Sequence, residues 1–80
     1  MKEEVKVRVN AIEEMIQVVL LAIPREINAY EFYISAARKA TSDSSRDLFV
    51  TLAQQEKGHE AELRKILGDL KTELSDLKTL

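Results

Sequence analysis

Hydrophobic side chains recur along this chain at alternating steps of three and four residues, in two long segments separated by a polar stretch. That spacing places each set on one helical face, so the pattern predicts an all-α protein with helices at residues 11–40 and 44–68. Pro24 lies inside the first segment and is expected to kink it, because proline removes one helical hydrogen bond. The positions on the two predicted faces are Ile12, Ile16, Val19, Ile23, Glu26, Tyr30, Tyr33, Ala37 and Ala40, and then Phe49, Leu52, Glu56, His59, Leu63, Ile66 and Leu70.

The polar stretch between the helices, residues 41–45, consists of side chains that favour turns and helix caps. Ser42, Asp43 or Ser44 is the expected N-cap of the second helix. So short a connection makes the two helices antiparallel neighbours. Residues 1–80 are therefore predicted to form a single domain, an antiparallel two-helix hairpin.

The pattern leaves alternatives at both ends of the hairpin. Residues 1–10 are either an N-terminal arm or an extension of the first helix, and Asn10 with Glu13 resembles a capping box that would start the helix there. Gly68 favours an end to the second helix. Residues 69–80 are therefore expected to form a short C-terminal helix or a tail.

A lone hairpin of this size has little apolar surface that it can bury by itself. The chain has 80 residues, of which 45% are hydrophobic and 32% charged, and each helix can bury only one stripe against the other. The remaining apolar surface needs cover from a partner. The expected unit is a homodimer or a larger even-numbered homo-oligomer, in which two hairpins form a four-helix bundle.

Charge, hydropathy and cysteine content argue against several classes of partner. The 12 basic and 14 acidic residues give a net charge of −2 with no basic block, so nucleic-acid binding is not expected. The longest apolar run, residues 18–23, is too short to cross a membrane, which takes about 20 residues, and no secretory signal is recognisable. The absence of cysteine removes thiolate ligands and fits the reducing cytoplasm, the expected location.

Three polar residues interrupt the apolar faces: Glu26 on the first helix, and Glu56 and His59 on the second. A buried carboxylate needs a cation, a salt bridge or a role, because burial of an unpaired charge is costly. Glu26 lies as far before the middle of the loop as His59 lies after it, and Glu56 is one turn closer to the loop. At about 1.5 Å rise per residue, all three reach nearly the same height. They are therefore the predicted metal ligands and catalytic residues.

One hairpin supplies too few ligands for a closed site, whereas two hairpins supply four carboxylates and two imidazoles. A Glu from each of two helices, with Glu-x-x-His from each of the other two, is the ligand set of di-iron and di-manganese bundles. Residues 56–59 have that spacing. Such ligands favour iron, with manganese or zinc as substitutes. Glu60 and Glu62 are expected on a solvated face, with Glu62 as an alternative ligand because it lies three residues beyond His59.

The sequence around these residues resembles the rubrerythrin branch of the ferritin-like superfamily and the short encapsulated ferritins, over residues 12–70. Residues 26–33 match the family pattern of Glu, two residues, Ala, three residues and Tyr. Residues 48–59 match the family's run into its Glu-x-x-His motif.

This resemblance implies a ferritin-like four-helix bundle made of two hairpins, with a di-iron centre at the dimer interface. Glu26 and Glu56 would be the carboxylate ligands and His59 the terminal nitrogen ligand, while Tyr33 would hydrogen-bond near the metals. The implied activity is that of a ferroxidase, which oxidises Fe(II) with dioxygen for iron storage or detoxification. A location inside an encapsulin-type shell would follow from the encapsulated ferritins.

The sequence also departs from these families. Full rubrerythrins carry both hairpins in one chain and have a cysteine-ligated iron module, which this chain lacks. Peroxide reduction in their manner would therefore need an external electron donor. Nothing in residues 69–80 matches the shell-targeting peptide of encapsulated ferritins. A different alternative is a metal-free dimerisation or adaptor module, in which Glu26, Glu56 and His59 form a polar layer that fixes the register of the helices.

Overall fold

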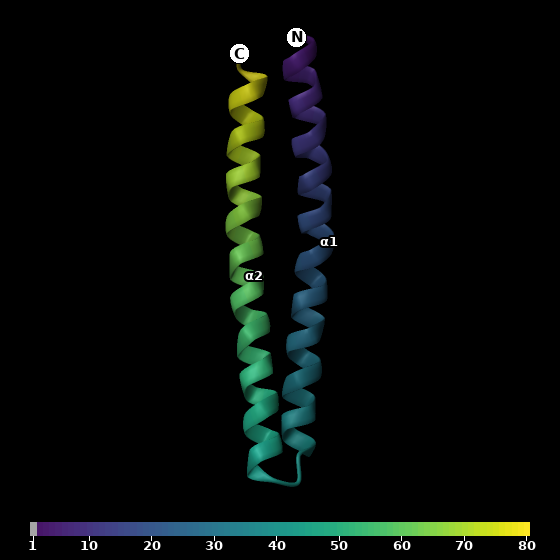
Figure 1. Ribbon diagram of the computed structural model, residues 1–80, viewed down its shortest axis with the longest axis vertical. Helices are drawn as coiled ribbons and strands as arrows, with labels where there is room; N and C mark the ends of the chain where they lie inside the picture. The colour runs from purple at the N-terminus through teal and green to yellow at the C-terminus, as the bar shows by residue number, and fades with distance from the viewer. Residues whose placement is uncertain (1) are drawn as a thin grey trace.

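The computed structural model describes residues 2–80, which form a hairpin of two long α-helices (Figure 1). The first helix, α1, spans Glu3–Lys39 and the second, α2, spans Asp43–Lys78. The helices lie side by side along their whole length, so both chain ends are at one end of the molecule and the loop is at the other (Figure 1). The described residues contain no strand, and the hairpin measures 61 × 14 × 12 Å. The predicted all-α helical hairpin is confirmed.

Helix α1 begins at Glu3 rather than at residue 11, so residues 3–10 are part of this helix and not an arm. Val9 is buried in a cluster with Leu77, and Val5 packs against that cluster from the preceding turn. This burial stabilises the first turns of α1 against the last turns of α2, and tertiary packing outweighs the capping-box resemblance at residues 10–13.

Helix α2 continues through Gly68 to Lys78, so residues 69–78 are neither a separate helix nor a tail. Gly68 does not adopt a positive φ, the conformation with which glycine usually ends a helix. Leu70 and Leu74 pack against the buried cluster beyond it. The gain from burying these leucines exceeds the cost of glycine inside a helix, which is about 1 kcal/mol.

The loop is closed by a helix cap at Ser42, one of the three candidates named above. Its backbone is extended, and its hydroxyl oxygen accepts a hydrogen bond from the backbone N–H of Ser45 at 3.2 Å. Arg46 donates to Asp43 at 2.9 Å and to the carbonyl oxygen of Ala40 at 3.4 Å. These bonds satisfy groups that would be unpaired at the ends of the two helices, and they make Asp43 the first residue of α2.

Pro24 lies in an exposed position inside α1, and the helix continues through it without interruption. Its ring therefore faces solvent, and the contact between the two helices continues past it on the opposite side of α1.

The core of the hairpin consists of the side chains that meet between the two helices. Most of the buried residues come from α1, where all but Val9 are at positions that the spacing predicted. No large side chain among the described residues is completely buried. Many large apolar side chains remain exposed, so the two helices alone do not cover all of their apolar surface. The buried residues are Val9, Ile12, Ile16, Val19, Ile23, Ala37, Ala53 and Leu77.

Candidate metal centre

Glu26, Glu56 and His59 meet near the middle of the hairpin, between α1 and α2. One potential ligand atom from each lies within 4.8 Å of the others, close enough for a single metal ion to touch all three. The antiparallel arrangement brings residues equally far from the loop to one height, which is why positions so distant in the sequence converge here.

The imidazole of His59 lies beside both carboxylates. Its Nδ1 is 3.4 Å from Oε2 of Glu26 and 3.6 Å from Oε2 of Glu56. The side chains of Glu26 and Glu56 are only 24% and 18% exposed, whereas that of His59 is 55% exposed. The carboxylates therefore lie in the seam between the helices, and the imidazole lies at its edge.

One carboxylate oxygen in this group lacks a hydrogen bond. Oε2 of Glu26 is buried and has no hydrogen-bond partner among the described residues. The Nδ1 atom of His59 is 3.4 Å away but forms no hydrogen bond with it. A buried acceptor without a partner costs about 1–3 kcal/mol. A cation at this point would satisfy it, and the oxygen and nitrogen donors fit iron or manganese. The residues present therefore fit the predicted metal.

His59 belongs to a wider apolar face of the hairpin, which we call the His59 face. Arg8 of α1 and Glu73 of α2 form an ion pair of 3.7 Å, which shows that they lie on the same side of the molecule. Residues at intervals of seven from these two lie on that side as well. The His59 face thus consists of Met15, Ala22, Ala29 and Ala36 from α1 and Leu52, His59 and Ile66 from α2.

The opposite side of the seam is closed by charged and aromatic side chains. The Lys57 ammonium lies 4.3 Å from the centre of the Tyr30 ring and 3.7 Å from Oε1 of Glu60. Arg64 donates from Nε to the other oxygen of Glu60 at 2.9 Å. The expectation of a solvated face was wrong for Glu60, whose side chain is only 15% exposed. It lies four residues after Glu56 and seven before Leu67, a spacing that places it on the inner side of α2.

Comparison with known families agrees with this architecture. A family model, Rubrerythrin, matches residues 2–78. The chain belongs to the rubrerythrin family. Neither the comparison with curated proteins nor that with solved structures gives a match. Membership of the rubrerythrin family is consistent with an iron-binding, ferritin-like protein, and the three-residue group has ligand atoms that could hold a metal ion.

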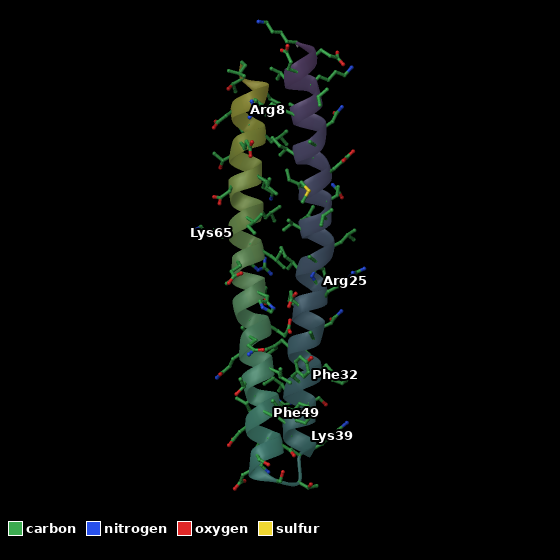
Figure 2. The ribbon with its side chains drawn as sticks, viewed as in Figure 1. Arg8, Arg25, Phe32, Lys39, Phe49 and Lys65 are labelled. Atoms are coloured by element: carbon green, nitrogen blue, oxygen red, sulfur yellow. The ribbon has the colours of Figure 1, made fainter. Side chains whose placement is uncertain are left out.

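Two other residues predicted near the rubrerythrin-family centre lie outside the three-residue group. The ring of Tyr33 stacks on Phe49 at 6.5 Å and meets Phe32 edge-on at 5.5 Å, and its hydroxyl forms no hydrogen bond with Glu26, Glu56 or His59 in the described hairpin. Figure 2 shows Phe49 in the seam and Phe32 on the outer side of α1. Glu62 is exposed and is not part of the group.

Within the described residues, neither helix has a stretch that is both long and apolar enough to span a bilayer.

Proposed function

We propose that this rubrerythrin-family hairpin is a di-iron carboxylate protein that acts as a ferroxidase after pairing with a second copy. The observation that carries the proposal is the convergence of Glu26, Glu56 and His59 around a carboxylate oxygen that has no hydrogen bond. A polar layer that only fixed helix register would be expected to satisfy its own hydrogen bonds, because half-satisfied polar groups weaken a core. The metal interpretation therefore has more support than the adaptor.

The second copy follows from the number of ligands and from the His59 face. Three ligands from one chain leave an ion open to water, and His59 points to the edge of the seam, where another chain can meet it. A twofold dimer that joins two His59 faces would supply two carboxylates and one imidazole per metal ion. It would also bury Met15 and Ile66, which are exposed in the single hairpin.

Each residue then has a defined task. Glu26 and Glu56 bind the ions through carboxylate oxygens, and His59 binds through a neutral imidazole nitrogen. Bound Fe(II) would supply the electrons that reduce dioxygen. Iron oxidised in this way would either be stored or be retained as a cofactor. Manganese in place of iron and enclosure in an encapsulin-type shell belong to the same proposal.

The test is an anaerobic titration of the purified protein with Fe(II), followed by exposure to dioxygen. We expect about one iron per chain, two per dimer, and oxidation to Fe(III) on mixing with oxygen. The control is the double variant Glu56→Ala/His59→Ala, which should bind no iron at the centre. Equal binding by the protein and its control would refute the metal centre and favour the adaptor. Oxidation by hydrogen peroxide but not by dioxygen would favour a peroxide reductase.

A further inference from the structure

The side chains of Lys57 and His59, one and three residues after Glu56, project from α2 on opposite sides of the seam. Lys57 and His59 are two residues apart, which on a helix of 3.6 residues per turn separates their directions by roughly 160°. His59 lies on the His59 face, the side that pairs with the second copy in the proposed dimer. Lys57 lies on the other side, where its ammonium bridges from α2 to the Tyr30 ring of α1.

In the proposed dimer, the Lys57 side is where the seam of each hairpin still meets solvent. A second copy covers the His59 face, so an ion that enters an assembled centre between α1 and α2 has to pass Lys57. Glu60 contacts this residue through Oε1, 3.7 Å from the ammonium, and lies one turn from Glu56 with a side chain that is only 15% exposed. At about 100° per residue, Glu60 projects from α2 in a direction between those of Glu56 and Lys57, so around the helix it lies between the exposed lysine and the ligand.

We propose that Glu60 and Lys57 form the entrance of the metal centre, an inference that rests on the proposed metal binding. Glu60 binds the incoming divalent cation first, and the cation displaces the Lys57 ammonium from Oε1 of Glu60. The cation then moves on to Glu56. The Tyr30 ring and Oε1 of Glu60 already hold one cation, the ammonium itself. A negative oxygen and the face of an aromatic ring attract any cation, so a metal ion can exchange with the lysine.

Arg64 keeps Glu60 from becoming a permanent ligand. Its guanidinium donates to Oε2 of Glu60 at 2.9 Å from the side away from Glu56, four residues further along α2. Once the ion has moved on, Lys57 can return to Oε1 and Arg64 still holds Oε2. Glu60 therefore affects how fast the centre fills and not how much metal it holds at equilibrium.

The experiment measures the rate of Co(II) binding by stopped-flow absorbance, because Co(II) binds oxygen and nitrogen ligands and is coloured when coordinated. Glu60→Gln removes the entrance carboxylate with little change in shape, and Glu62→Gln removes an equal charge from an exposed site outside the three-residue group. We expect Glu60→Gln to slow binding by about 10-fold and Glu62→Gln by less than about 2-fold, since a local charge can change on-rates by 10-fold or more. The final amount of Co(II) bound should be the same in both.

Lys57→Met provides an independent test if Glu60→Gln does not fold. It keeps the aliphatic stem over Tyr30 and removes the ammonium, so we expect faster Co(II) binding. The matched control is Lys65→Met, at a lysine that points away from α1 (Figure 2).

The possible results separate this inference from the proposed function. Equal slowing by Glu60→Gln and Glu62→Gln would mean that only general attraction acts, and a lower final amount of Co(II) in Glu60→Gln would make Glu60 a permanent ligand. Equal rates for Lys57→Met and Lys65→Met would also overturn the entrance. Failure of the unchanged protein to bind more Co(II) than Glu56→Ala/His59→Ala would instead refute the metal centre itself.

Discussion

Glu26 is expected to lower the free energy of unfolding of the hairpin when no metal is bound. Glu26 occupies a helical position where its neighbours Val19 and Ile23 are buried and apolar, and one of its oxygens is buried without a hydrogen bond. Glu56 lies on the facing side of α2 and its negative charge adds to the cost, whereas Glu60 is paired with Lys57 and Arg64. Such a site is expected where a polar group is retained for binding rather than for folding.

Replacement of Glu26 by leucine should therefore stabilise the metal-free protein while it abolishes metal binding. The variant removes an unsatisfied buried acceptor and extends the apolar row, for an expected gain of about 1 kcal/mol in the free energy of unfolding. Urea denaturation of the metal-free proteins measures this change in the free energy of unfolding. The control is Glu31→Leu, at an exposed position of α1. A lower stability for Glu26→Leu would mean that this carboxylate is satisfied without metal.

Metal affinity should fall as the pH is lowered, because protons compete with the metal for the imidazole and for both carboxylates. The group binds as neutral imidazole and as carboxylate, so binding releases protons and becomes stronger as the pH rises. Co(II) titrations at a series of pH values between about pH 8 and about pH 5.5 measure the slope of affinity against pH. A Co(II) affinity that does not change with pH would contradict His59 as a ligand. The variant His59→Ala should bind Co(II) weakly at every pH.

The convergence of the three residues could be predicted from the sequence because its signal is local to each helix. Glu26, Glu56 and His59 stand at positions where the repeat calls for apolar residues, and an antiparallel hairpin fixes which heights coincide. Glu60 was missed because the inner face of α2 has a second row, Ala53, Glu60, Leu67 and Leu74, that a single stripe omits. The seven-residue spacing of that row was the available signal.

At the scale of the elements, the sequence predicted both helices and, to within one residue, their ends at the loop. It left the start of α1 open between an arm and a helix extension, and it ended α2 too early, at residue 68. Local signals at residues 10–13 and at Gly68 favour helix ends, while Val9 and Leu77, far apart in the sequence, favour continued helices by packing together. Burial of these side chains depends on the facing helix, and a local motif carries no information about it. The Ser42 cap was predictable among its alternatives because it acts within a few residues.

Gly68→Ala should stabilise the hairpin. The glycine is helical, has no positive φ, and an added methyl group would have no atom within 4 Å. Alanine lowers the conformational entropy of the unfolded chain, so the expected gain is about 0.5–1 kcal/mol. Gly58→Ala has the same open surroundings and should give a similar gain, which thermal unfolding of the two variants can check. Destabilisation by Gly68→Ala would show that α2 does not continue as a regular helix at this point.

The whole molecule is too thin to enclose a core. At 61 × 14 × 12 Å it is two helices wide and one helix deep, so each helix has apolar residues that no part of the described hairpin covers. The exposed apolar side chains do not all face one way. Ile66 lies seven residues from His59 and shares its face, whereas Leu21 is two residues from both Val19 and Ile23 and therefore points away from α2. The location of the centre favours the His59 face as the one that pairs.

This difference gives a matched test of the pairing surface. Ile66→Lys places a charge on the His59 face, where the side chain is 46% exposed in the single hairpin, and Leu21→Lys places the same charge on the opposite side of α1, at 67% exposure. We expect Ile66→Lys to raise the dissociation constant of the dimer by at least about 10-fold, because burial of an unpaired lysine is costly. Fe(II) binding should weaken in parallel. Leu21→Lys should change neither. Analytical ultracentrifugation with and without metal measures the association. Dissociation by Leu21→Lys alone would place the interface on the other side, where His59 cannot be shared, and would separate metal binding from dimerisation in this chain.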